Sequence, residues 1–276
     1  MKNNFEDRIN EYLSSLRKCE ITDAIKYAIE GGKHFRPRVI FSILNGMGID
    51  ESLGYDAALA LEMIQTYSLI HDDLPAMDND DMRRGKPSLH KAFREDIAIL
   101  TGDQLLTQSF GIVAESKNYD DLTKAKIIAA LSKYAGLDGM VYGQLLDVTS
   151  DGKQINKDEL FEIQDNKTGG LFKIACLIAC YIGKDSNEEF YLKLGSLIGQ
   201  IFQNQDDLFD LIKTEKELGK STSDAKNDKS TALSIYSLEE LQKLIEDEFN
   251  YLKAYLNNAS FNTEYLMDLL NKLKTR

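Results

Sequence analysis

The chain has 276 residues, of which 43% are hydrophobic and 28% are charged, so it is too apolar for a disordered protein and has too few long apolar runs for a membrane protein. Its 33 basic and 45 acidic residues leave a formal charge of −12, which makes nucleic acid and anionic membranes poor partners. Only three prolines interrupt it, which favours long helices, and a chain of this size buries a core without disulfides or structural zinc.

The first half of the chain predicts helices. Residues 1–13 are polar and lack the apolar stretch of a signal peptide, so we expect the protein in the cytoplasm. Residues 21–32 predict a helix that is capped at Thr22 or Asp23 and ends at two glycines. Residues 56–71 are apolar on most sides, which is typical of a central helix.

The second half continues the helical pattern. Asn156 and Glu159 have the spacing of a capping box, which predicts the start of a helix towards Lys167. Two further apolar stretches follow, and the first carries Cys176 and Cys180 one turn apart, as expected for buried core thiols. Two polar stretches, 75–90 and 213–231, are predicted to be irregular. No composition shift marks a boundary, so we predict one all-α domain over residues 1–276.

Two acidic clusters stand at the ends of two apolar helical stretches. The first contains Asp72, Asp73 and Asp78, and the second contains Asp206, Asp207 and Asp210. Like charges next to a core are costly unless a cation neutralises them. Carboxylates without histidine or cysteine suit a hard ion such as Mg²⁺, which proteins bind through a few carboxylates and substrate phosphates.

Basic residues gather at glycine-broken junctions near these clusters. They are Lys33, Arg36, Arg83, Arg84, Lys86, Lys167, Lys220 and Lys229. Arginine and lysine are the usual ligands of phosphate groups. Magnesium sites together with separate basic sites predict diphosphate chemistry with two anionic substrates.

Five motifs carry a family resemblance. They are GGKHFRP (31–37), SLIHDDLPAMDNDDMRRGKP (68–87), GMVYGQLLD (139–147), KTGGLF (167–172) and FQNQDDLFD (202–210). In order and spacing they resemble the polyprenyl diphosphate synthases, particularly the bacterial short-chain members of the farnesyl type, and the resemblance extends from about residue 5 to the C-terminus. It implies a single-domain helical bundle around a central cavity, the isoprenoid synthase fold, which usually forms a homodimer.

The resemblance also implies roles for individual residues. About three Mg²⁺ ions would be held by Asp72, Asp78 and Asp206, with Asp73, Asp207 and Asp210 as direct or water-mediated partners. The allylic diphosphate would contact Arg83, Lys167, Thr168, Gln203 and Lys220, with Lys229 nearby in the same loop. Isopentenyl diphosphate would contact Gly32, Lys33, Arg36, Gln65 and Arg84. The catalytic set would be Asp72, Asp78, Arg83, Lys167, Asp206 and Lys220.

Two positions depart from the family pattern. Gln65 stands where many bacterial relatives have histidine, although its amide still donates to a phosphate oxygen. His34 stands where arginine or lysine is common, and we do not include it in the predicted site.

The implied reaction is ionisation, condensation and elimination. Isopentenyl diphosphate would be condensed with dimethylallyl and then geranyl diphosphate to give farnesyl diphosphate, with charge on the leaving diphosphate stabilised by Mg²⁺ and cationic side chains. The alternatives are a geranyl or geranylgeranyl diphosphate synthase, a terpene cyclase and a non-catalytic partner subunit. A complete second acidic motif and the GGKHFRP motif disfavour the cyclase, and two intact acidic motifs disfavour the partner subunit.

Product length is predicted from the helix that ends at Asp72. Tyr67 lies five residues earlier, or about 7.5 Å deeper along a helix. Next to the small Ser68, its ring resembles the farnesyl pattern, in which an aromatic side chain forms the floor of the cavity. Tyr67 could equally be an ordinary core residue with no role in product length. The family resemblance decides between the two interpretations and favours a C15 product.

Overall fold

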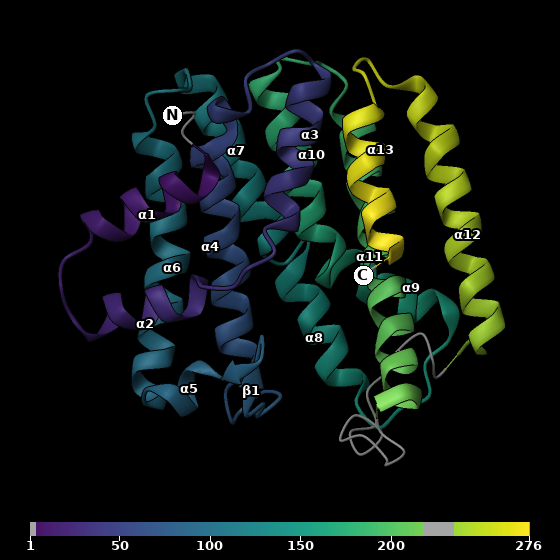
Figure 1. Cartoon of the computed structure of the whole chain (residues 1–276), viewed down its shortest axis with the longest axis horizontal. Coiled ribbons are helices and arrows are strands. Elements are labelled where there is room, and N and C mark those ends of the chain that lie inside the picture. Colours follow the sequence, from purple (N-terminus) through teal and green to yellow (C-terminus); the bar gives the residue numbers. More distant parts are fainter. Residues whose placement is uncertain (1–3, 218–234, 276) are drawn as a thin grey trace.

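The computed structural model describes residues 4–217 and 235–275, and there the chain forms a bundle of α-helices with one small hairpin (Figure 1). The helices are α1 (Phe5–Ser15), α2 (Glu20–Ile29), α3 (Phe35–Gly46), α4 (Tyr55–Asp72), α5 (Leu89–Ala92), α6 (Glu95–Glu115), α7 (Asp121–Ala135), α8 (Met140–Ser150), α9 (Lys157–Lys167), α10 (Gly169–Ile182), α11 (Glu188–Glu217), α12 (Leu238–Tyr255) and α13 (Glu264–Asn271). Short 3₁₀ turns are η1 (Glu51–Gly54), η3 (Leu256–Asn258) and η4 (Lys272–Thr275), and the strands are β1 (Met82–Arg83) and β2 (Lys86–Pro87). The predicted all-α fold is confirmed.

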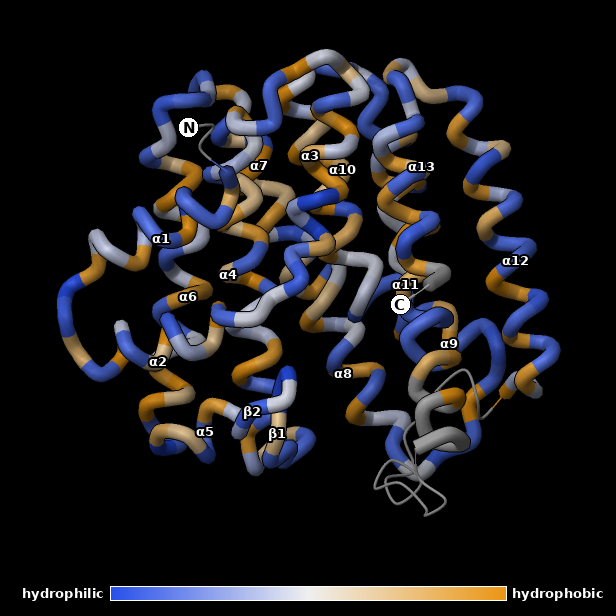
Figure 2. Tube along the Cα trace, in the orientation of Figure 1, coloured by the Kyte–Doolittle hydropathy of each residue, from blue (hydrophilic) through white to orange (hydrophobic). Residues whose placement is uncertain are grey.

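α4 and α10 form the centre of the core. α4 packs against α6, and α10 packs against α11. All residues of α10 from Gly169 to Tyr181 except Lys173 are buried, which agrees with a sequence that is apolar on every side. Cys176 and Cys180 are fully buried free thiols, as predicted, and burial raises the pKa of Cys180 to about 12. The outer helix α12 alternates instead between hydrophilic and hydrophobic residues (Figure 2).

The helix starts were predicted with mixed success. The capping box of α9 is present, because the Asn156 side chain accepts from the Glu159 amide at 3.0 Å and the Glu159 side chain accepts from the Asn156 amide at 2.8 Å. The predicted cap of α2 is wrong. That helix begins at Glu20, before Thr22 and Asp23, and the Thr22 hydroxyl donates to the Arg17 carbonyl instead.

The polar stretch 75–90 is more ordered than its composition predicts. β1 and β2 pair antiparallel, with Met82 opposite Pro87 and Arg83 opposite Lys86. The two residues between them, Arg84 and Gly85, have φ angles of 54° and 76°, as expected for a tight two-residue hairpin turn. The hairpin therefore holds Arg83 and Arg84 on a defined backbone.

The second stretch predicted to be irregular begins as helix. α11 continues through residues 213–217, because its long apolar pattern is extended by good helix formers. The rest of this stretch falls between the two described parts of the chain. Lys220 and Lys229 lie there, outside the described residues, and their predicted roles stay predictions.

α6 is long and apolar enough to cross a membrane by length and composition, as core helices also are, and it is the only such helix in the described ranges. Only 44% of its apolar window is buried within the chain. One side packs on α4, while Leu100 on the other side is 48% exposed. α6 therefore combines a core face with an uncovered apolar face.

Candidate active site

A cavity of about 1100 Å³ opens among the central helices and collects most of the predicted site. The predicted residues that line it are Lys33, Arg36, Gln65, Tyr67, Ser68, Asp72, Arg83, Arg84, Lys167, Thr168, Gln203 and Asp206. Gly32, Asp73, Asp78 and Asp207 are not among the lining residues, and the side chain of Asp210 lies outside the described part of α11. Five motifs spread over 180 residues thus meet at one place.

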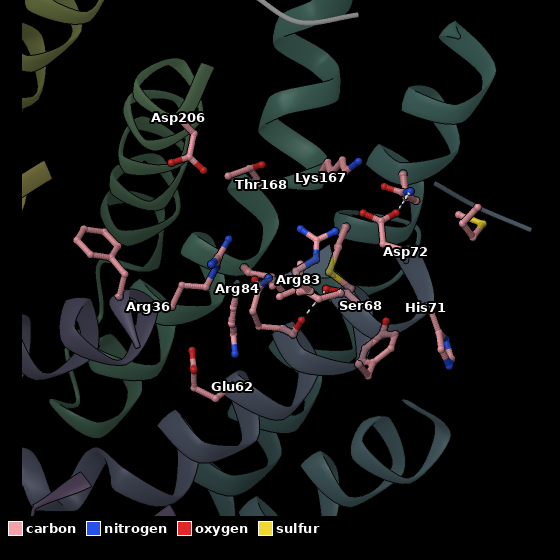
Figure 3. A pocket seen from close by; sticks show the side chains of 18 of the residues that line it. Arg36, Glu62, Ser68, His71, Asp72, Arg83, Arg84, Lys167, Thr168 and Asp206 are labelled. Atoms are coloured by element: carbon pink, nitrogen blue, oxygen red, sulfur yellow. Dashed lines mark hydrogen bonds between the residues drawn. The ribbon is translucent and has the colours of Figure 1, made fainter. Parts of the chain in front are cut away.

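One aspartate of each acidic cluster faces the cavity, and the two come from different helices. Asp72 is the last residue of α4 and Asp206 belongs to α11, and their carboxylates lie on opposite sides of the cavity (Figure 3). The loop after Asp72 folds back on itself, because the Asp78 amide donates to the Asp72 carbonyl at 2.9 Å. This turn keeps Asp78 beside Asp72. Gln144 of α8 also donates its side-chain amide to the Asp72 carboxylate.

The second aspartate of the first cluster orients an arginine. Asp73 is 2% exposed and accepts from Nε of Arg83 at 2.9 Å, while Nη2 of Arg83 also reaches Asp80 at 3.2 Å. Burial raises the pKa of Asp73, and the charge and hydrogen bonds of Arg83 only partly oppose it. The pair holds Arg83 at the cavity wall. A metal-binding role for Asp73 stays a prediction.

A chain of hydrogen bonds joins Thr168, the residue just before α10, to the second acidic cluster. The Thr168 hydroxyl donates to Oε1 of Gln203 at 2.7 Å, and Nε2 of Gln203 donates to Asp207 at 2.9 Å. Asp207, which accepts the last of these hydrogen bonds, is buried. Thr168 and Gln203 are thereby held in fixed orientations where they border the cavity.

Lys167 has a partner that sequence reasoning missed. It forms an ion pair with Asp147 of α8, three residues after Gln144. The spacing of three places Gln144 and Asp147 on one face of α8, and both belong to the GMVYGQLLD motif, whose residues had no assigned roles. The spacing of polar residues within that motif was the available signal.

A separate basic wall contains Lys33, Arg36 and Arg84. The guanidinium of Arg36 lies 4.6 Å from the ring centre of Phe172 and 5.6 Å from that of Phe202, which restrains it by cation–π contact. Nη1 of Arg84 donates to the Ala28 carbonyl at 3.2 Å, leaving other guanidinium donors for a ligand.

Gln65 and His34 complete this wall. Oε1 of Gln65 is buried and has no hydrogen-bond partner among the described residues. His34, which sequence reasoning left out, also lines the cavity. Its Nδ1 lies 2.6 Å from Glu62 and its Nε2 lies 3.2 Å from Glu6.

Tyr67 and Ser68 border the same cavity from α4. The Tyr67 ring is 8% exposed, and burial raises the pKa of its hydroxyl. It packs edge-on against His71, with 5.8 Å between ring centres. Ser68 donates its hydroxyl to the Gln65 carbonyl at 2.9 Å. Both residues border the cavity, and their role in setting product length stays a prediction.

The donor set fits Mg²⁺ held jointly with a ligand. Among the side chains that the structure describes, which do not include that of Asp210, no three carboxylate, imidazole or thiol groups converge closely enough to hold an ion by themselves. Asp72 and Asp206 instead supply oxygen donors from two sides of one cavity. Mg²⁺ is commonly bound this way, through one or two carboxylates and substrate phosphates.

Comparison with known proteins decides the family. Residues 18–270 match the model of the family described as "Polyprenyl synthetase". The chain belongs to this family. The polyprenyl synthetase is 37% identical over 286 residues to farnesyl diphosphate synthase of Bacillus subtilis, covering 100% of this chain and 95% of that protein. It is 39% identical over 274 residues to a geranylgeranyl diphosphate synthase of Cyanophora paradoxa, covering 96% and 91%.

A solved structure agrees. The geranyltransferase from Helicobacter pylori complexed with magnesium and isoprenyl diphosphate has a TM-score of 0.86 and is 27% identical, and the match covers 99% of this chain and 96% of that one. The predictions of the polyprenyl synthetase family, of the isoprenoid synthase fold and of a prenyltransferase are confirmed.

Proposed function

We propose that this polyprenyl synthetase condenses isopentenyl diphosphate with dimethylallyl and then geranyl diphosphate to give farnesyl diphosphate. One observation carries the proposal: a single cavity has an acidic mouth at Asp72 and Asp206 and, apart from it, a basic wall at Lys33, Arg36 and Arg84. A one-substrate cyclase needs only the first of these features. Two diphosphates, one bound with metal and one bound by cations alone, need both.

The allylic diphosphate would lie between the acidic clusters. Mg²⁺, about three ions, would be held there by Asp72, Asp78 and Asp206, with Asp73, Asp207 and Asp210 in support. When bound, it stabilises negative charge on the leaving diphosphate as a Lewis acid. Arg83 and Lys167 add positive charge to the same diphosphate, and each is oriented by an aspartate, Asp73 and Asp147 respectively.

The second substrate would bind at the basic wall. Lys33, Arg36 and Arg84 would grip its diphosphate, and Gln65 offers an amide that can donate to it. Below the two diphosphates, apolar lining residues such as Leu171 and Phe202 exclude water, which would otherwise quench the allylic cation. The fixed dipoles of Thr168 and Gln203 border the reaction space.

A C15 product is proposed because Tyr67 and Ser68 border the cavity on the helix that ends at Asp72. The family relatives include both farnesyl and geranylgeranyl enzymes, so similarity alone does not choose between the two lengths.

One experiment tests the reaction and the length together. The purified protein is incubated with Mg²⁺, radiolabelled isopentenyl diphosphate and, in turn, dimethylallyl, geranyl or farnesyl diphosphate, and the products are sized. We expect a C15 product from the first two primers and little turnover of the third. A main product of C20 would replace the length assignment. Cyclised hydrocarbon would support the cyclase, and activity only after addition of a second chain would support the partner subunit.

We also propose a cytoplasmic homodimer that uses the uncovered face of α6. Between Ile97 and Ala114 the only charged residue is Asp103, and Leu100 is 48% exposed. A second copy that covered this face would remove the exposed apolar area from water. Light scattering should give the mass of two chains, and Leu100→Glu should shift it towards one.

A further inference from the structure

His34 lies between charged residues from three elements, α1, α4 and the β1–β2 hairpin. It lies in the left-handed region with φ 47°, directly before α3, a conformation that non-glycine residues adopt rarely and only when surrounding contacts enforce it. Its side chain is 11% exposed. The charged groups that face the ring are Glu6 from α1, Glu62 from α4 and Arg84 from the hairpin.

The ring nitrogens show which protonation state this geometry suits. Each nitrogen faces a carboxylate, Glu62 at 2.6 Å and Glu6 at 3.2 Å, and an ionised carboxylate only accepts hydrogen bonds. An imidazolium donates to both. A neutral ring keeps one nitrogen lone pair, which would point at a carboxylate oxygen and be repelled.

The ring is also in close contact with the basic wall. A Cβ added to Gly32 would lie 2.9 Å from Cε1 of His34 and 3.4 Å from Nη1 of Arg84, so the turn of residues 31–34 is folded tightly around the imidazole. Lys33 and Arg36 flank His34 in the chain, and all three line the cavity. Movement of the ring away from either carboxylate would therefore shift the backbone that carries these cations.

We propose that His34 is a positioning residue whose proton locks the turn of residues 31–36 in the geometry that binds isopentenyl diphosphate, so that affinity for this substrate falls as pH rises. The inference rests on the proposed role of the basic wall. Burial by itself lowers the pKa of His34, but the hydrogen bond and charge of Glu62, with help from Glu6, outweigh burial and the opposing charge of Arg84, so the pKa is raised. His34 is fully protonated, and the turn fully held, below the ordinary pKa of histidine. Both are lost as pH rises through the raised pKa of His34.

Protonation of His34 and binding of isopentenyl diphosphate should each favour the other. A bound diphosphate adds negative charge near His34 and so favours its protonation, and by linkage the proton favours binding equally. Above the midpoint, KM for isopentenyl diphosphate should rise by up to about tenfold per pH unit, while KM for geranyl diphosphate should not share this rise.

The experiment compares KM for both substrates across pH in four variants. His34→Arg carries a permanent charge that can donate to both carboxylates, so the ratio of wild-type to variant KM for isopentenyl diphosphate should rise with pH; the ratio cancels ionisation of the substrate. Glu6→Gln should move the wild-type midpoint to lower pH. Glu11→Gln is its matched control, because Glu11 lies on the same helix, is exposed and pairs with Arg8 at 3.6 Å. It should leave the midpoint unchanged.

The fourth variant separates this inference from the proposed function. If Arg36→Ala raises KM for isopentenyl diphosphate but the ratio for His34→Arg stays constant across pH, the role of His34 is refuted and the basic wall stands. If Arg36→Ala leaves that KM unchanged, the assignment of the wall itself fails. The chain has only three histidines, so NMR titration can follow His34 directly. If bound isopentenyl diphosphate does not raise the titration midpoint of His34, the proposed coupling between protonation and binding is also overturned.

Discussion

Replacing Tyr67 with alanine should lengthen the product. Tyr67 precedes Asp72 by five residues on α4, so its Cα lies about 7.5 Å deeper than the aspartate that would anchor the diphosphate. Its ring centre is 5.8 Å from that of His71, one turn nearer the mouth. Removing the ring opens space below His71 of about the size that one more five-carbon unit needs. We expect C20 as a main product in place of C15.

The variant should remain folded. Replacing a buried aromatic residue with alanine costs about 3–5 kcal/mol, and the lower end applies here because the ring already borders a cavity instead of filling a sealed core. For a chain of this size, a cost of about 3 kcal/mol lowers the melting temperature by about 6 °C. Turnover can therefore be measured at ordinary assay temperatures, with circular dichroism as the check on folding.

Product sizing by chromatography or mass spectrometry gives the answer, and Tyr55→Ala is the matched control. Tyr55 lies on the same helix and is 7% exposed, compared with 8% for Tyr67. It packs against Phe41 with 5.2 Å between ring centres and does not border the cavity. It should lose comparable stability and still yield C15. A Tyr67→Ala enzyme that stops at C15, or a Tyr55→Ala enzyme that makes C20, would refute the reasoning.

Three further predictions address charge. Asp72→Ala and Asp206→Ala should each lower kcat by at least about 100-fold while the circular dichroism spectrum is retained. If either variant keeps near-normal turnover, the aspartate that it lacks is not a metal ligand. Asp73→Asn should raise KM for the allylic substrate because Arg83 loses its charged partner, and a changed Mg²⁺ requirement with unchanged KM would mark Asp73 as a ligand instead. Burial raises the pKa of Glu248 to about 7, so the stability contributed by its neutral, protonated side chain is lost as pH rises through that value. Glu248→Gln, which is neutral at every pH, should therefore raise the melting temperature at pH 8 but not at pH 5.

The sequence by itself determined the all-α fold and the positions of several helices, among them α4 and α9. Apolar periodicity along residues 56–71 and a capping box at Asn156 are local signals, and α4 and α9 formed where these signals lay. The cavity residues were predicted by resemblance, since nothing in the spacing of Asp72 and Asp206 states that their helices meet.

Only the tertiary structure decided which side chains act on one another. Asp73 and Asp72 are neighbours in the chain, yet one is buried against Arg83 while the other borders the cavity. His34 was left out of the predicted site, and it is held between Glu62, 28 residues away, and Glu6 on α1. Contacts of this kind depend on the direction of each side chain and on the packing of α1, α3 and α4, because local sequence specifies a helix but not the face that its neighbour will cover.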